Sequence, residues 1–345
     1  MPTAKISPRF SDLDSLRGVA VLMVVLFHLT FRYNQIYGFE TGPLVLFPYG
    51  FLGVDLFFMI SGYVIFMTIE KAKKPLDFVI ARIARLYPSY WTAVLLTFTV
   101  VSIFSLPGRE VSLYNAILNL SMLQSWIFVP PVDGVYWTLV VEIEFYIVIL
   151  LLFIFKKLKS VEKFGFYALF FIVLVHLLPV PFKSQITSIF IIKYFNLFLA
   201  GILFYKIKNE GNSLNKNMLL FCCLIIQFIV SDIARLTVIF LFFSVFYLTI
   251  LEKLTILKNK LIQYVGLISY PLYLIHQNIG YVIIRTLSSY HVNNILLLVI
   301  PIIITTLIAM AIHHIIEDPF RKLIRDYYAN KIKIDFDKKR IIVNS

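Results

Sequence analysis

An arginine and a histidine bracket the first apolar run of the chain, DSLRGVAVLMVVLFH, and both could do chemistry. Arg17 and His28 are eleven residues apart, so a helix turns roughly 20° beyond three full turns between them and presents both on one face. The helical rise separates them by roughly 16 Å. Because a hydrocarbon core is about 30 Å thick, Arg17 can stand at one interface while His28 lies inside the membrane, where an ionisable group indicates a functional site. A structural histidine bonded to a neighbouring helix is the alternative.

Three further ionisable residues fall in other apolar runs. Asp55 lies in GVDLFFMISGYVI, Glu142 in YWTLVVEIEFY and His276 in SYPLYLIHQN. Helical rise from the expected span ends places all three in the outer half of the membrane, at a depth close to that of His28. A carboxylate beside an imidazole fixes its tautomer and raises its basicity, so we expect Asp55 or Glu142 to orient His28. A structural Asp55 that caps a helix or pairs with Arg32 is the alternative.

A second arginine pair lies in ARIARLYPSYW. Arg82 and Arg85 are three residues apart and share a helix face near the inner interface, where Arg17 also lies. Paired guanidinium groups suit phosphates, although plain anchoring at the membrane surface is the alternative. The sequence therefore predicts an acid/base site reached from outside, above an anion site reached from inside. An anionic donor with a long arm would connect the two sites.

The elements that position these residues are membrane-spanning helices. The chain has 345 residues, of which 60% are hydrophobic, and its mean hydropathy is +0.86. Long charge-poor runs recur from end to end, which is typical of a polytopic all-α bundle. The two cysteines, Cys222 and Cys223, are adjacent and form neither an ordinary disulfide nor a zinc set, so we expect no metal. The first apolar run lacks a cleavage site and should remain as a span.

About ten spans are expected, with a membrane domain over residues 1–325 and a charged cytoplasmic tail over 326–345. Pro271 should bend the ninth span just below His276. The predicted spans are 17–33, 50–69, 88–106, 136–155, 164–180, 186–205, 217–231, 235–251, 262–286 and 294–316.

The basic residues set the orientation of these spans. The formal net charge is +13, with 32 Lys and Arg residues in all. If both termini are cytoplasmic, 26 of the 32 lie in inner segments and five in outer loops, as the positive-inside rule requires. The cations then line an anionic lipid leaflet and do not form a nucleic-acid surface.

These motifs in this order resemble the acyltransferase-3 family of integral membrane acyltransferases. The resemblance runs from LDSLRGVAVLMVVLFH to IEDPFRKL. It includes the Arg17–His28 spacing, the Arg82–Arg85 pair and the motifs around Asp55, Glu142 and His276. Many family members carry a further hydrolase-like domain, and this chain is similar to the stand-alone O-acetyltransferases of O-antigen, polysaccharide or peptidoglycan.

The resemblance implies a donor, an acceptor and a location. The donor would be cytoplasmic acyl-CoA, most simply acetyl-CoA, with its phosphates on Arg82 and Arg85. His28 would be the catalytic histidine, and the acceptor a hydroxyl of a cell-surface glycan or lipid-linked oligosaccharide at a bacterial cytoplasmic membrane. A proton-coupled transporter is the main alternative, because intramembrane His, Asp and Glu can form a proton relay. A non-catalytic membrane partner of a glycan-assembly enzyme is another.

Overall fold

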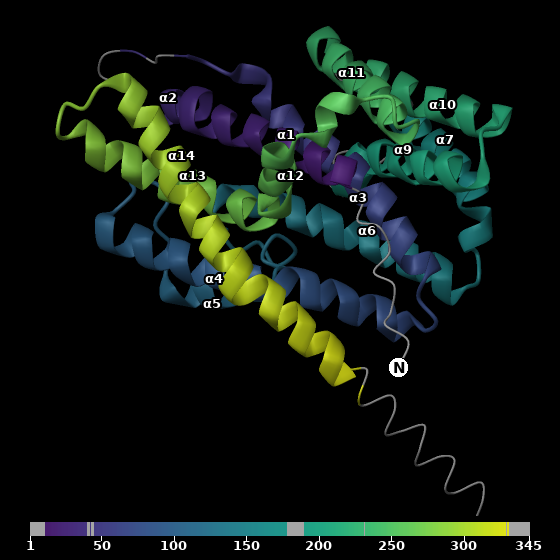
Figure 1. The fold of residues 1–345 in the computed structure, drawn as a ribbon, viewed down its shortest axis with the longest axis horizontal. Helices are drawn as coiled ribbons and strands as arrows, with labels where there is room; N and C mark the ends of the chain where they lie inside the picture. The colour runs from purple at the N-terminus through teal and green to yellow at the C-terminus, as the bar shows by residue number, and fades with distance from the viewer. Residues whose placement is uncertain are drawn as a thin grey trace, which may run out of the picture.

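The computed structural model describes residues 11–39, 42, 45–177, 190–230, 232–328 and 330, and within these ranges all regular structure is helical (Figure 1). The all-α prediction is confirmed. Lys183 and most of the expected tail over 326–345 lie outside the described residues. The helices are α1 Ser11–Leu26, α2 Tyr33–Ile36, α3 Gly53–Glu70, α4 Pro75–Phe104, α5 Leu113–Asn119, α6 Trp137–Ile154, α7 Val161–Leu177, α9 Phe190–Glu210, α10 Leu214–Val230, α11 Ile233–Ile250, α12 Lys260–Leu267, α13 Ser269–Ser288 and α14 Asn294–Ala311.

Six short helical segments join or extend these helices. Two are π-helical: η1 Phe27–Arg32 joins α1 to α2, and η6 Ile312–Glu317 extends α14. The other four are 3₁₀ turns: η2 Pro48–Leu52, η3 Gly134–Tyr136, η4 Leu158–Ser160 and η5 Thr255–Lys258.

Seven of the described helices are long and apolar enough to cross a membrane. The other predicted spans correspond to α9, α10 and the α12–α13 pair, which are helices at the expected positions. The count of ten spans and the cytoplasmic placement of both termini stay predictions. The seven are Asp12–Ile36, Pro48–Glu70, Pro75–Phe104, Gly134–Ile154, Leu158–Leu177, Ile233–Ile250 and Asn294–Tyr328.

Helix α4 begins earlier than predicted. It starts at Pro75 rather than near residue 88, because proline suits a first helical turn and the Asp77 carboxylate accepts the backbone N–H groups of Lys73 and Lys74 at 3.1 and 2.8 Å. Arg82 and Arg85 therefore lie inside a helix of 30 residues.

The predicted bend at Pro271 is a break between two helices. Helix α12 ends at Leu267 and α13 begins at Ser269. Proline has no N–H to bond the carbonyl four residues earlier, which is that of Leu267, and its ring clashes with that carbonyl. The break redirects α13 into the centre of the bundle.

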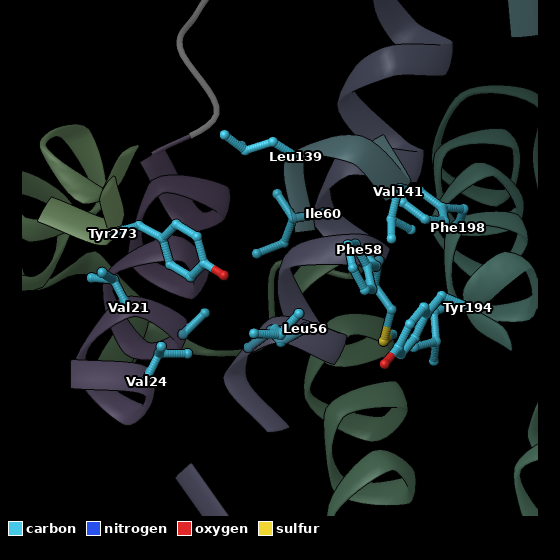
Figure 2. Close-up of a cluster of buried hydrophobic side chains, with 14 of the residues drawn as sticks. Val21, Val24, Leu56, Phe58, Ile60, Leu139, Val141, Tyr194, Phe198 and Tyr273 are labelled. Carbon is cyan, nitrogen blue, oxygen red and sulfur yellow. The ribbon is translucent and has the colours of Figure 1, made fainter. Parts of the chain in front are cut away.

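Helix α13 is buried almost all round, from Pro271 to Val282. It packs against α1, α4 and α14, while α3 packs against α1 and α9. Helices α7, α9, α10 and α11 gather at the other end of the bundle (Figure 1). Figure 2 shows the core between α1, α3, α6, α9 and α13, where Val24, Leu56, Phe58, Phe198 and Tyr273 are buried.

Glycines let the helix backbones approach closely at the α3–α9 contact. A Cβ on Gly201 of α9 would overlap the Met59 carbonyl of α3, and one on Gly62 would overlap the Phe198 carbonyl. Small residues at helix crossings allow such backbone contact in membrane bundles.

We predict that Gly201→Ala destabilises the bundle. The added methyl meets backbone atoms that cannot rotate away, and overpacking of this kind costs about 1–3 kcal/mol. Gly165→Ala is the control, because a Cβ there meets only the flexible Leu199 side chain. Thermal unfolding in detergent should show the larger loss for Gly201→Ala, and equal losses would contradict the proposed backbone contact.

Candidate active site

Two imidazoles from separate helices meet inside the bundle. His28 is half-buried in the π-helical turn η1, and His276 is fully buried in α13. His276 Nε2 lies 3.0 Å from His28 Nδ1, and the ring centroids are 5.0 Å apart. Turns of this π type occur frequently at functional sites. The structure thus brings together two of the ionisable residues that the sequence singled out.

Backbone carbonyls set the direction of hydrogen bonding in this pair. His276 Nδ1 lies 2.8 Å from the Tyr273 carbonyl oxygen, and a carbonyl can only accept, so Nδ1 carries the proton. In a neutral His276, Nε2 then accepts from His28 Nδ1, which also lies 3.1 Å from the Val24 carbonyl oxygen. This assignment leaves His28 Nε2 with the lone pair that a general base or a nucleophile needs.

Asp55 bonds a different partner from the one predicted. Its carboxylate accepts from the Arg235 guanidinium at 2.8 Å, and both side chains are largely buried. The expectation that Asp55 orients His28 is therefore wrong, and so is the alternative pairing with Arg32, which donates to Gln35. Arg235 lies in the first turn of α11, and sequence spacing did not indicate that α11 packs beside α3.

Glu142 faces a cavity rather than His28. Its carboxylate accepts from the Tyr146 hydroxyl at 2.5 Å and from the Ser61 hydroxyl. The expectation that Glu142 orients His28 is wrong, because these hydroxyls and not an imidazole bond its carboxylate. Glu144 points elsewhere and accepts from the Trp126 indole N–H at 3.1 Å and the Ile191 backbone N–H at 2.9 Å.

The cavity holds about 110 Å³ and lies between α1, α3, α4, α6 and α13. Arg17, Arg82 and Arg85 all line it, together with Glu142. The three predicted arginines thus share one cavity although they come from two helices, α1 and α4, whose sequence motifs lie far apart.

An aromatic side chain separates this cavity from the histidine pair. Tyr273 lines the cavity, and its ring centroid lies 5.7 Å from that of His276. Its hydroxyl lies 2.9 Å from Thr138 Oγ1 and donates to the Val135 carbonyl at 3.2 Å. Figure 2 shows the Tyr273 ring turned toward Ile60 and Leu139, which also line the cavity.

A buried carboxylate that the sequence analysis did not single out holds one arginine of this site. Glu317 is fully buried in η6 and forms an ion pair with Arg85. His313 Nδ1 and Ser89 Oγ approach the same carboxylate at 3.2 and 3.4 Å. His313 and Glu317 are four residues apart, a helix-face spacing that was the available sequence signal.

Arg82, unlike Arg85, forms no ion pair among the described residues. Its guanidinium donates to Thr68 Oγ1 at 3.5 Å and lies 5.8 and 5.9 Å from the ring centroids of Phe78 and Tyr146. Its buried Nε has no hydrogen-bond partner among the described residues. A guanidinium held this way retains donors for an anion, and carboxylate and phosphate are the anions whose geometry such a fork matches.

The comparisons with known proteins agree with this chemistry. The acyltransferase-3 family, described as an acyltransferase domain, matches residues 10–314. A Bacillus subtilis protein provisionally named peptidoglycan O-acetyltransferase YrhL is 29% identical over 155 residues, which is 39% of this chain and 22% of that protein. No solved structure matches.

Longer matches come from Staphylococcus aureus. A protein of strain COL, provisionally named an O-acetyltransferase, is 26% identical over 374 aligned positions, which cover 90% of this chain and 57% of that protein. A provisionally named acetyltransferase of Acidianus two-tailed virus is 28% identical over 149 residues, 43% of this chain and 42% of that protein. The chain thus spans between 22% and 57% of the length of these relatives.

We predict that Glu317→Gln destabilises the protein by roughly 3 kcal/mol, because it leaves the Arg85 charge buried without its carboxylate. The double variant Glu317→Gln/Arg85→Gln should lose less than the sum of the two single losses. Arg321→Gln is the control, since it breaks a more exposed pair with Asp318 and should cost less than about 1 kcal/mol. Unfolding in micelles measures all four variants. Additive losses would show that Glu317 and Arg85 do not act as a pair.

Proposed function

The chain belongs to the acyltransferase-3 family, and from this premise we propose that it transfers an acyl group, most simply acetyl, from cytoplasmic acyl-CoA to a sugar hydroxyl. The acceptor is a cell-surface glycan or a lipid-linked oligosaccharide at a bacterial cytoplasmic membrane. One observation carries the proposal: the cavity lined by Arg17, Arg82 and Arg85 reaches Tyr273, which contacts the histidine pair. An anion with a long reactive arm fits this arrangement.

The three arginines line the end of this cavity at which the phosphates of acyl-CoA would bind, which we call the donor end. Acyl-CoA carries phosphates at one end and a thioester at the other, so guanidinium groups at the cavity end hold the phosphates while the arm passes toward His28. Glu317 positions Arg85 through their ion pair. Val54, Ile60 and Leu139 provide the apolar wall along which the arm lies.

The histidine pair supplies the acid/base chemistry. His28 Nε2 takes the proton of the acceptor hydroxyl as its oxygen attacks the thioester carbonyl carbon. The C–S bond then breaks, and the sulfur of CoA receives the proton from His28, so the imidazole is neutral again. His276 keeps His28 in the required tautomer through the bond between the two rings. A two-step route uses the same geometry: the acyl group moves first from CoA to His28 Nε2 and then from His28 Nε2 to the acceptor hydroxyl.

The contacts of the intramembrane carboxylates favour this reaction over a proton-coupled transporter. A proton relay needs titratable groups in hydrogen-bond reach of one another. Asp55 bonds Arg235, and Glu142 bonds Ser61 and Tyr146. No hydrogen bond between either carboxylate and the histidine pair is present in the described part of the chain.

The names of the relatives support the choice of acceptor. The Bacillus subtilis relative is named for O-acetylation of peptidoglycan and the Staphylococcus aureus relatives for O-acetylation alone. A glycan acceptor on the outer side of the membrane agrees with these names and with a histidine pair beyond the arginines.

We predict that His28→Ala lowers the release of CoA thiol from acetyl-CoA by at least roughly a hundredfold, the usual contribution of a general base. The assay uses purified protein in nanodiscs with candidate glycans. His176→Ala is the matched control, because His176 lies in α7 with Nδ1 2.9 Å from the Ile172 carbonyl oxygen and outside the cavity lining. Unchanged turnover in folded His28→Ala would overturn the proposed role.

Arg82→Gln/Arg85→Gln should raise the KM for acetyl-CoA by roughly tenfold or more, because it removes charge-assisted bonds to the phosphates. The KM for short N-acyl thioesters of cysteamine, which lack phosphates, should not change. Equal effects on both donors would contradict a phosphate site at these arginines.

We predict a different kinetic signature for the positioning residue His276. His276→Ala should lower kcat by roughly tenfold or more and leave the KM for acetyl-CoA within about twofold, because only the tautomer and orientation of His28 change. His276→Asn restores an acceptor near His28 Nδ1 and should recover part of kcat. A rise in KM at constant kcat would place His276 in donor binding instead.

A further inference from the structure

A second group of polar side chains lies beyond the histidine pair, at the end of the first helix away from Arg17. It consists of Tyr37, Arg109, Gln277 and Tyr281, and we call it the outer cluster. A methyl group on Gly134 would stand 3.2 Å from the Arg109 guanidinium and 3.1 Å from Gln277 Oε1. These two side chains therefore converge over Gly134, which leaves them room because it has no Cβ.

The outer cluster adjoins the histidine pair directly. Gln277 follows His276 in the sequence, and Arg109 converges with the Gln277 side chain at Gly134. The Tyr281 ring centroid lies 5.9 Å from that of Tyr37. None of these four residues lines the cavity that holds Arg17, Arg82 and Arg85. The histidine pair thus has an arginine-lined cavity on one side and the outer cluster on the other.

A buried aspartate fixes the loop that carries Gly134. Asp133 is fully buried and accepts the backbone N–H groups of Asn278 at 3.0 Å and Val135 at 3.2 Å. The Asn278 amide in turn donates to the Val132 carbonyl at 2.9 Å. These bonds join the loop to α13 two residues beyond His276. They place Gly134 against Gln277 and hold the cluster in position without a bound ligand.

The cluster has hydrogen-bonding capacity that the protein does not use. The buried Tyr281 hydroxyl has no well-formed hydrogen bond within the described ranges, and the Gln277 side chain is the polar group that approaches it. Arg109 interacts with the Tyr37 hydroxyl, which itself donates to the Pro107 carbonyl at 3.0 Å. No carboxylate of the described residues forms an ion pair with Arg109 within 4.0 Å, since the nearby Asp133 bonds backbone N–H groups instead.

We propose that the outer cluster binds the acceptor and that this acceptor is an anionic saccharide, with its carboxylate or phosphate on Arg109. The inference rests on the proposed acyl transfer, because it assigns the second substrate of that reaction. A half-buried guanidinium without a carboxylate partner favours an anion. The Gln277 amide and the Tyr281 hydroxyl then bond the sugar hydroxyls. His28 lies next to this cluster and takes the proton from the hydroxyl that reacts.

The test measures saccharide binding separately from transfer. The protein in nanodiscs is titrated with cellotriose, a matched trisaccharide that carries one uronic acid, and a matched trisaccharide that carries one phosphate. Wild type and Arg109→Gln are compared, with Arg285→Gln as the control for loss of a nearby charge that does not converge on Gly134. Each variant is also assayed for release of CoA thiol from acetyl-CoA.

We expect at least one acidic trisaccharide to bind roughly tenfold tighter than cellotriose in wild type and Arg285→Gln, as one charge-assisted bond provides. In Arg109→Gln this preference should fall to within about twofold, with neutral-sugar binding unchanged. The comparison of the two acidic sugars shows whether carboxylate or phosphate is the anion. No preference in wild type, no binding of any of the three, or a preference that survives Arg109→Gln would each overturn the inference.

The design separates this inference from the proposed function. His28→Ala should bind the acidic trisaccharide like wild type, because it keeps Arg109 and loses only the chemistry. Binding that depends on Arg109 in a protein without His28-dependent thiol release would refute the acyl transfer and retain the anion site. Transfer that depends on His28 but ignores acceptor charge would refute the anion site and retain the transfer.

Discussion

The hydrogen bond between His28 and His276 is the contact on which the rest of the site depends. It joins a π-helical turn to the central helix α13, and it has a defined direction because the Tyr273 carbonyl accepts the other His276 proton. No carboxylate of the described residues bonds either imidazole, so a positive charge on the pair would have no compensating partner there, and a lone buried ion is costly. The same contact places His28 Nε2 between the arginine-lined cavity and the outer cluster.

Two buried carboxylates elsewhere in the bundle each pair with an arginine from another helix. Asp55 bonds Arg235, and Glu317 bonds Arg85. Each pair links helices that are distant in sequence, so each charge is both compensated and positioned. Arg82 and Arg109 differ, since neither forms an ion pair among the described residues. Arg82 lines the cavity and Arg109 belongs to the outer cluster, so these two guanidinium groups lie on opposite sides of the histidine pair, as a reaction between two separately bound substrates requires.

The sequence was sufficient for the helical class, most helix positions and the grouping of Arg17, Arg82 and Arg85, because these follow from hydropathy and helical spacing. The sequence did not predict the hydrogen-bond partners of Asp55 and Glu142, which were expected to contact His28. Depth along a helix can be counted from a span end, but rotation about the axis and the choice of neighbour depend on packing. Residues at one depth can therefore face different helices. The His28–His276 contact and the role of Glu317 needed the positions of α13 and η6, which a single sequence does not specify.

The ion pair between Arg85 and Glu317 has a consequence for the biogenesis of the protein. Arg85 is made early, in α4, whereas Glu317 lies in η6, near the C-terminal end of the described helices. While the chain is being synthesised, Arg85 lacks the carboxylate of Glu317 until nearly all of the other described helices have emerged. The donor end of the cavity is therefore completed only when the C-terminal helix docks against α4. A nascent or truncated chain without that helix would hold an uncompensated cation, a feature that membrane quality control can recognise.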